Sequence, residues 1–312
     1  RRKYCLWLCR RKGKSRKSAG VLDPLPGDDE HVLISTHTYV SHRNTKEVKA
    51  IVYKLNIYNG RLTRHAVSPV KNAHMLVDPK GQVRVAVGSD DELSTKVMYR
   101  ASHDEEWRVI DQYAYGKGGM LPLEFYENSN KFFVKSNHDH TLPGLFEFDP
   151  DSGEKRLLYR HELVDFEPFI KYDEATKKSS LVGTFIMPDR ASKVYLDSEL
   201  SAVDIAFDNL FPDDYVKVTG RSADKMFSIV RVTSDRNPGE FYLFDKQKNS
   251  LTYLASRRPW IDPVKMATKK PFSFKARDGL TLHGYLTLPS GKKAEKLPMI
   301  VHPHGGPHGP RD

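Results

Sequence analysis

The stretch Leu297–Pro307 reads Leu-Pro-Met-Ile-Val-His-Pro-His-Gly-Gly-Pro and is the most informative part of this chain. Its first five residues form an apolar run with prolines around it, which predicts a short buried strand. The run leads into two histidines and the pair Gly305-Gly306. Adjacent glycines let the backbone turn without a Cβ, so an amide N–H can point at an oxygen atom that develops negative charge.

A second informative stretch lies just upstream. Phe272–Arg277 and Leu280–Leu288 flank Asp278-Gly279, a dipeptide typical of tight turns, and the pattern predicts a β-hairpin. Taken together, Pro271–Pro289 and Leu297–Pro307 resemble the start of the catalytic domain in the prolyl oligopeptidase family of serine peptidases. The resemblance is strongest to the branch of acylaminoacyl-peptidases and dipeptidyl peptidases, in which the loop reads His-Gly-Gly-Pro.

The resemblance implies a β-propeller followed by an α/β-hydrolase domain, with short peptides as substrates. It implies that the backbone N–H groups of Gly305 and Gly306 form part of an oxyanion hole. His304 stands where other branches place a Tyr hydroxyl donor, so both support of the loop and a direct hydrogen bond stay open. The family's Ser, Asp and His lie downstream of this loop, and no triad residue can be assigned here. We therefore expect a fragment that is inactive alone.

The rest of the chain shows a repeat. A short strand bearing an aromatic residue recurs at intervals of 46, 47, 49 and 47 residues, anchored by Tyr53, Tyr99, Phe146, Tyr195 and Tyr242. Further strand-turn-strand patterns lie between the anchors, across Asp78–Gly81 and across Asn128–Asn130. Four strands per period are typical of propeller blades. The predicted fold is therefore mainly β: a partial β-propeller of about five blades, then the first strands of an α/β-hydrolase domain.

One segment departs from this repeat. Between residues 197 and 213, apolar residues recur at helical spacing, and Pro212 ends the run. We expect a short amphipathic helix whose apolar face carries Leu200, Val203, Phe207 and Leu210. The Pro-rich connection Pro259–Pro271 marks a domain boundary. The predicted organisation is a basic leader at 1–20, disordered or non-native, a partial propeller at 21–268 and a truncated hydrolase domain at 269–312.

The formal net charge of +10 is concentrated in that leader. Residues 1–18 hold nine of the 50 Lys and Arg and no acidic residue, and the other 41 basic residues nearly balance 40 Asp and Glu. The body therefore has little net field to attract nucleic acid. The leader's apolar run is too short for a membrane span of about 20 residues. An anchor through lipidated Cys5 and Cys9 stays open. Because both cysteines lie there, the body has no disulfide, and cysteine content leaves cytoplasm and periplasm equally open.

Other candidate sites have simpler interpretations. Gly220–Asp224 lacks the second glycine of a Gly-x-Ser-x-Gly nucleophile turn and lies between two predicted strands, so we expect a hairpin turn. The histidines 302, 304 and 308 have no local carboxylate partner, and we expect no metal. Asn137–His140 reads as a solvated turn. No phosphate-binding glycine loop or dinucleotide fingerprint indicates an organic cofactor.

Two rival functions stay open. One is a propeller that binds peptides or proteins without hydrolysing them. The other is an esterase or amidase of the same fold, which would use the same acyl-transfer chemistry. A downstream Gly-x-Ser-x-Gly, Asp and His would separate an enzyme from a binding platform. The sequence does not determine cleavage preference, exo- or endopeptidase action or blade number, and a homo-oligomer stays open.

Overall fold

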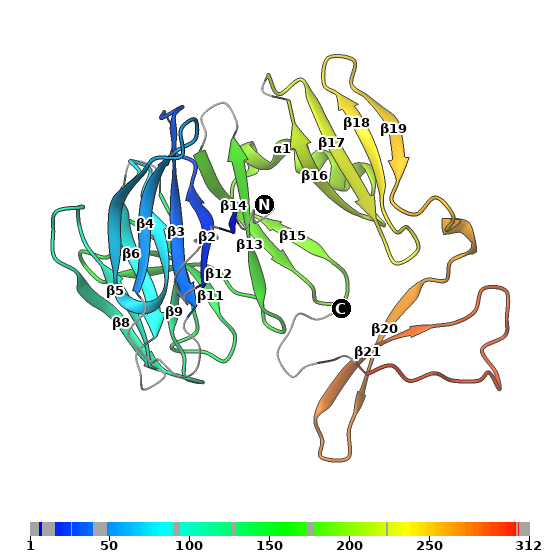
Figure 1. Cartoon of the computed structure of the whole chain (residues 1–312). Helices are drawn as coiled ribbons and strands as arrows, with labels where there is room; N and C mark the ends of the chain where they lie inside the picture. The colour runs from blue at the N-terminus through cyan, green and yellow to red at the C-terminus, as the bar shows by residue number, and fades with distance from the viewer. Residues whose placement is uncertain are drawn as a thin grey trace. The chain divides into compact units, whose positions relative to one another are not determined.

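The computed structural model describes residues 6–7, 16–25, 27–39, 49–89, 94–126, 129–173, 178–222, 224–303 and 305. Within them the chain is a succession of antiparallel sheets with one α-helix in the described part (Figure 1). The chain divides into two compact units, Arg1–Leu181 and Val182–Asp312, and each is described by itself.

The first unit opens with two four-stranded groups that share one long strand. Strand β5, Leu62–Val77, pairs with β4 through its first half and with β6 through its second. Irregular register around Lys71–His74 separates the two halves. The first group is β2–β5 and the second is β5–β8. Their remaining strands are β2 Arg16–Asp23, β3 His31–Tyr39, β4 Lys49–Asn56, β6 Val83–Ser89, β7 Ser94–Tyr99 and β8 Arg108–Ala114, with β1 Leu6–Trp7 along the edge of β2.

Strand β2 begins inside the segment predicted as a leader. It starts at Arg16, before the predicted boundary at residue 20, and pairs with β3 from Arg16↔Tyr39 onward. Ala19 in this strand is buried. Residues 16–20 of the predicted leader thus belong to a sheet, because backbone pairing does not depend on the charge of the side chains. Cys5 and Cys9 lie outside the described residues.

The third group packs face to face with the second. It consists of β9 Met120–Phe125, β10 Phe132–Ser136, β11 Gly144–Phe148 and β12 Lys155–Tyr159, paired in the order β12-β11-β10-β9. Tyr99 and Val97 of β7 share one core cluster with Phe132 and Val134 of β10, and all four are completely buried. Two twisted sheets with their apolar faces together are what adjacent propeller blades present.

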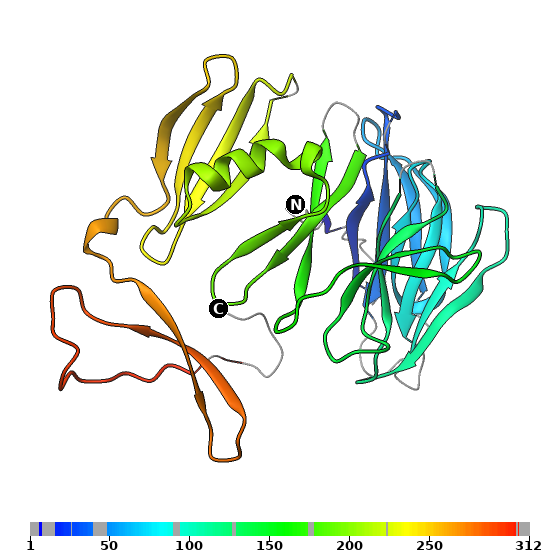
Figure 2. The same cartoon turned by 180° about the vertical axis from the view of Figure 1, so that it is seen from behind.

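The fourth group has three strands and is followed by the helix. Its strands are β13 Phe166–Asp173, β14 Lys178–Ile186 and β15 Ser192–Tyr195. Helix α1, Ser198–Leu210, comes next in the chain, where the other groups have a fourth strand. The fifth group follows as β16 Tyr215–Arg221, β17 Phe227–Thr233, β18 Glu240–Asp245 and β19 Ser250–Ser256. Figure 2 shows α1 along one face of this last sheet.

The helix was predicted, but its buried face is only partly the predicted one. Phe207 is buried against Val216 and Val230, and Val203 packs on the same cluster. Leu210, however, is 58% exposed, while the polar Asp204 is buried, with Arg221 at 3.5 Å from its carboxylate. The apolar spacing rule missed this because an ion pair from β16 stabilises a charged residue on the inner face.

The five anchor residues occupy equivalent places. Tyr53 lies in β4, Tyr99 in β7, Phe146 in β11, Tyr195 in β15 and Tyr242 in β18, which are the third strands of the five successive groups. One interval between anchors therefore corresponds to one group of strands. The fold is mainly β and follows a partial propeller, as predicted. No helix in the described part of the chain is long and apolar enough to cross a membrane.

Candidate functional site

A β-hairpin follows the fifth sheet and leads to the predicted site. Asp262 caps the short 3-10 helix η1, Pro263–Lys265, by accepting a hydrogen bond from the amide of Val264. Strands β20, Lys269–Lys275, and β21, Thr281–Thr287, then pair from Lys275↔Thr281 to Lys269↔Thr287. Gly279 has φ +85°, a left-handed conformation that favours glycine in the turn. The hairpin predicted across Asp278-Gly279 is thus confirmed.

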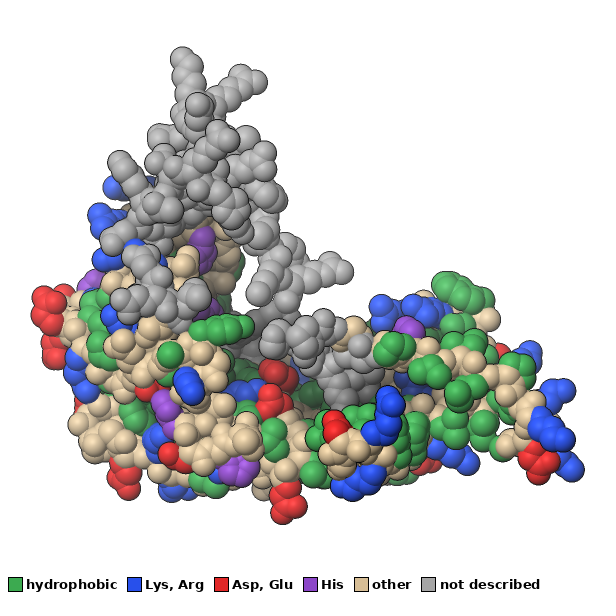
Figure 3. Space-filling view, turned by 90° about the horizontal axis from the view of Figure 1, so that it is seen from below, with side chains coloured by type: hydrophobic (Ala, Val, Ile, Leu, Met, Phe, Trp, Pro, Cys, Tyr) green, Lys and Arg blue, Asp and Glu red, His purple; other side chains and the backbone are tan. Residues whose placement is uncertain are grey.

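The two faces of this hairpin differ in polarity. The pairing places Phe272, Phe274, Leu282 and Leu286 on one face. Between 39% and 50% of each side chain is exposed. The Phe272 ring covers Gly284, where a Cβ would lie only 3.0 Å from the ring, so glycine permits this close approach. Figure 3 shows hydrophobic side chains at the surface in this part of the chain.

The predicted strand at Leu297–Val301 does not form. Residues 297–303 have no regular secondary structure, and Met299, Ile300 and Val301 are 81%, 93% and 73% exposed. The expectation of a buried strand was wrong for this chain. An apolar strand is stabilised by ladder partners and by burial of its faces, and the described residues provide neither at this position.

The predicted oxyanion loop is described only in part. His302 and Gly305 are exposed, and an ideal Cβ on Gly305 would meet no atom within 4 Å. The described structure therefore supplies no steric reason for glycine at 305. His304, Gly306 and residues 307–312 lie outside the described residues. The roles assigned to His304, Gly305 and Gly306 stay predictions.

Ser222, the nearest approach to a nucleophile, lies in a hairpin turn as predicted. The turn connects β16 to β17, and the amide of Phe227 donates to Ser222 Oγ over 2.9 Å. The Ser222 hydroxyl donates to Asp224 at 2.5 Å, which lowers the pKa of that carboxyl. A serine that donates to an exposed Asp inside a turn lacks the strained strand-to-helix setting of a hydrolase nucleophile.

The His-rich segment Asn137–His140 is a turn in the structure. His138, Asp139 and His140 are all exposed. His138 Nε2 lies 2.8 Å from an Asp111 carboxylate oxygen, and His140 Nδ1 accepts from the amide of Leu142. These contacts stabilise the loop locally. No group of three or more His, Cys, Asp or Glu suited to a metal ion occurs within the described ranges.

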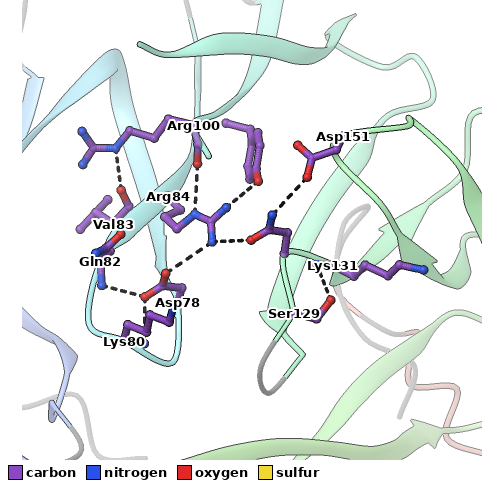
Figure 4. Close-up of polar contacts among 11 residues, drawn as sticks. Asp78, Lys80, Gln82, Val83, Arg84, Arg100, Ser129, Lys131 and Asp151 are labelled. Atoms are coloured by element: carbon purple, nitrogen blue, oxygen red, sulfur yellow. Dashed lines mark hydrogen bonds and ion pairs between the residues drawn. The ribbon is translucent and has the colours of Figure 1, made fainter. Parts of the chain in front are cut away.

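A buried polar network surrounds Arg84 in the first unit, and the sequence analysis did not predict it. Arg84 Nη2 donates to the Tyr99 hydroxyl at 2.5 Å, and Arg84 Nη1 donates to Asn130 Oδ1 at 3.1 Å (Figure 4). The same Nη1 lies 3.5 Å from the Asp78 carboxylate, which is buried as well. Arg84 Nε donates to the backbone carbonyl of Arg100. The available signal was a charged residue inside the valine-rich strand β6.

This network connects the second and third sheets. Asn130 belongs to the β9–β10 turn, and its amide donates to Asp151 in the β11–β12 turn. Arg108 of β8 also reaches that turn, donating to the carbonyl of Pro150 at 2.5 Å. Because Arg84 is only 5% exposed, its charge interacts with internal partners. The arrangement stabilises the junction between the sheets and presents no nucleophile.

A further cation with a buried side chain lies in the other unit. Lys193 of β15 is 4% exposed in its side chain, and its ammonium lies 2.6 Å from Asp208 of α1. The Tyr195 hydroxyl donates to the other oxygen of Asp208 at 2.6 Å. Burial and this carboxylate raise the pKa of Tyr195. The cluster anchors α1 to the fourth sheet, and the helical apolar pattern gave no sign of it.

Comparison with known proteins adds to these observations. No protein-family model matches the chain. The chain is 25% identical to dipeptidyl aminopeptidase BIII of Pseudoxanthomonas mexicana over 269 residues, which are 82% of this chain and 38% of that protein. It is 22% identical to dipeptidyl peptidase family member 6 of Caenorhabditis elegans over 252 residues, 70% of this chain and 33% of that one. The chain thus spans well under half the length of these relatives.

Solved structures show the same fold. A puromycin hydrolase variant in complex with PGG matches 86% of this chain and 42% of its own, with a TM-score of 0.51 and 12% identity. A puromycin-hydrolyzing peptidase of Mycobacterium tuberculosis matches 89% of this chain and 49% of its own, with a TM-score of 0.50 and 12% identity. The chain is thus similar in sequence to a dipeptidyl aminopeptidase and a dipeptidyl peptidase family member, and similar in fold to puromycin-hydrolysing peptidases.

Proposed function

We propose that this chain is part of a serine-type peptidase that hydrolyses short peptides through an acyl-enzyme. In this proposal residues 21–268 form a propeller that screens access of substrates, and residues 269–312 begin the α/β-hydrolase domain. The observation that carries it is the similarity to dipeptidyl aminopeptidase BIII along 82% of the chain. The proposal requires no metal and no organic cofactor.

The proposed contribution of this chain to the chemistry is electrostatic. A serine attacks the scissile carbonyl while a histidine accepts its proton, and the carbonyl oxygen becomes negatively charged. The backbone N–H groups of Gly305 and Gly306 would donate to that oxyanion, and the His304 side chain would support the loop. Donors of this kind act mainly in the transition state, so they accelerate the chemical step.

The hairpin supports the proposed start of a second domain. A two-stranded ribbon is at best marginally stable by itself and gains stability when one face is packed. The face bearing Phe272, Phe274 and Leu286 is apolar but about half exposed within the described structure. Such a face is suited to burial in a hydrophobic core of the kind a hydrolase domain contains.

The experiment compares this 312-residue chain with a version extended along its reading frame to the length of its relatives. Hydrolysis of a fluorogenic dipeptide amide by the extended protein only is the expected result. Cleavage of a small ester without cleavage of peptides would favour an esterase. Saturable peptide binding with no turnover of either substrate would favour a binding propeller and overturn the proposal.

A further inference from the structure

One end of the β20–β21 hairpin is hydrogen-bonded to a turn of the fourth group, β13–β15, and to a turn of the fifth group, β16–β19. The Tyr285 hydroxyl donates to the backbone carbonyl of Asp189 over 2.6 Å, although 96 residues separate them in the chain. Asp189 lies in the connection between β14 and β15. The backbone N–H of Lys269 donates to Asp235 Oδ2, also over 2.6 Å. Asp235 lies in the turn between β17 and β18.

These two contacts come from the same end of the hairpin. The register pairs Lys269 with Thr287 and Pro271 with Tyr285. Lys269 and Tyr285 are therefore diagonal neighbours on the polar face, opposite the face that carries Phe272 and Phe274. The Lys269 ammonium lies 5.9 Å from the centre of the Tyr285 ring, which brings the two anchoring residues into contact with each other.

The β14–β15 turn, which accepts the hydrogen bond from Tyr285, is stabilised by contacts of strand β15 with helix α1. Strand β15 is held to helix α1 by Lys193 and Asp208, whose charged atoms are 2.6 Å apart. The turn that receives Lys269 is closed by the Ser234 amide, which donates to the Asn237 carbonyl at 3.0 Å. The amide of Gly239 also donates to the Asn237 side chain. Both acceptors are thus presented by ordered turns, which is what an anchoring point requires.

We propose that Tyr285–Asp189 and Lys269–Asp235 form a two-point clamp that holds the hairpin on these turns and opens as a unit. Because both hydrogen bonds lie at the surface, where water competes for the donors and acceptors, the clamp is weak enough to open reversibly. Its functional consequence rests on the proposed function: the clamp positions the first ribbon of the hydrolase domain on the propeller. Tyr285 is in this sense a positioning residue, and its hydroxyl takes no part in bond breaking.

If the clamp opens as a unit, loss of one hydrogen bond should speed hydrogen exchange at the backbone amide of Lys269, which makes the other. Tyr285→Phe removes the bond to Asp189 and leaves the Lys269 amide and its acceptor in place. If the two hydrogen bonds are coupled, this variant raises the hydrogen-exchange rate of the Lys269 amide by roughly two- to tenfold. This is the change expected when the net stabilisation from one hydrogen bond is lost. Asp235→Ala, which removes the other acceptor directly, raises it at least as much.

The matched control is Tyr253→Phe, which removes a half-exposed tyrosine hydroxyl from β19 in the same unit. It should leave exchange at Lys269 unchanged. Residue-resolved exchange is measured on the 312-residue chain, with the β16–β17 amides as an internal reference for the fold. In parallel, trypsin cleavage after Lys265, in the linker before the hairpin, should accelerate in Tyr285→Phe and not in the control.

Two results would contradict the proposed clamp. One is an unchanged Lys269 exchange rate in Tyr285→Phe with intact β16–β17 protection, because the two bonds would then be independent. The other is equal acceleration in Tyr253→Phe, because the effect would then be general loosening. Neither readout measures peptide hydrolysis by this protein itself, so failure of the clamp proposal and failure of the peptidase proposal can be told apart.

Discussion

Arg84 Nη2 lies 2.5 Å from the hydroxyl of Tyr99, and both side chains are buried in the first unit. The guanidinium also neighbours the buried carboxylate of Asp78. Arg84→Met leaves that carboxylate without its cation and is expected to lower the free energy of unfolding by about 3–5 kcal/mol. Tyr99→Phe removes one hydroxyl and should cost about 0.5–1.5 kcal/mol. Urea unfolding measures both.

The exposed Arg61 provides the control for this pair. Arg61→Met removes the same charge from a solvated position and should change stability by no more than about 0.5 kcal/mol. If Arg84→Met were as mild as Arg61→Met, the network between the second and third sheets would contribute little to stability.

Phe132 is expected to be the most sensitive apolar position of the first unit. Its ring is completely buried and lies 5.2 Å from the ring centre of Phe125 and 5.4 Å from that of Phe148. Phe132→Ala should destabilise the chain by about 3–5 kcal/mol because it removes these contacts and leaves a cavity. Leu163→Ala, at a position 71% exposed, should be close to neutral. Equal melting temperatures for the two variants would contradict this assignment of the core.

His65 should make stability fall in mild acid. Burial, together with the nearby His103 ring, lowers the pKa of His65 below its ordinary value of 6.5. His65 Nε2 lies 3.2 Å from the carbonyl of Gly81, and the two imidazole ring centres are 5.0 Å apart. Because the unfolded chain takes up the proton more readily, this stability is present above pH 6.5 and is lost as the pH falls through the lowered pKa.

The measurement is the urea midpoint of the chain and of His65→Gln between about pH 8 and pH 5, a range that spans the ordinary histidine pKa. Glutamine can donate to the Gly81 carbonyl and does not titrate, so the fall with acid should be smaller in the variant. If the urea midpoint fell equally steeply with decreasing pH in both proteins, His65 would not contribute to the acid sensitivity of stability.

The parts of the fold that sequence could predict are those specified by neighbours in the chain. The interval between Tyr53 and Tyr99 predicted one group of strands because each group is built from consecutive strands. Asp278-Gly279 predicted a turn because its backbone conformation is local. The partner of Arg84 could not be predicted, since Asn130 lies 46 residues further along. Leu297–Val301 was predicted as a strand from its composition, but strand formation depends on partners that composition does not reveal.

The site was less predictable than the fold. The resemblance selected His304, Gly305 and Gly306, of which only Gly305 is described. The contact between Tyr285 and Asp189 had no sequence signal, because a tyrosine that alternates within a strand reads as an ordinary β residue. Its role depends on which turn lies beneath the hairpin, and that is decided by tertiary structure.

For the proposed oxyanion loop we predict a kinetic effect in the extended protein. Gly306→Val should lower kcat by roughly 10²–10³-fold, the effect of losing one oxyanion donor, with a smaller change in KM. His304→Ala should cost less if the imidazole only supports the loop. The control is an unchanged melting temperature. A Gly306→Val variant that melts normally and hydrolyses peptides at the unmodified rate would exclude this loop as the oxyanion hole.

The most direct test of the central claim is labelling with a fluorophosphonate probe, which reacts with activated serines. We propose that the nucleophile lies outside these 312 residues, because acyl-enzyme formation needs a serine activated by a base. Ser222, the nearest match to a nucleophile motif, lies in the β16–β17 hairpin turn. The extended protein should therefore be labelled stoichiometrically at a serine beyond residue 312, and the 312-residue chain should not be labelled. Stoichiometric labelling of any serine within residues 1–312, or none in a folded extended protein, would contradict it.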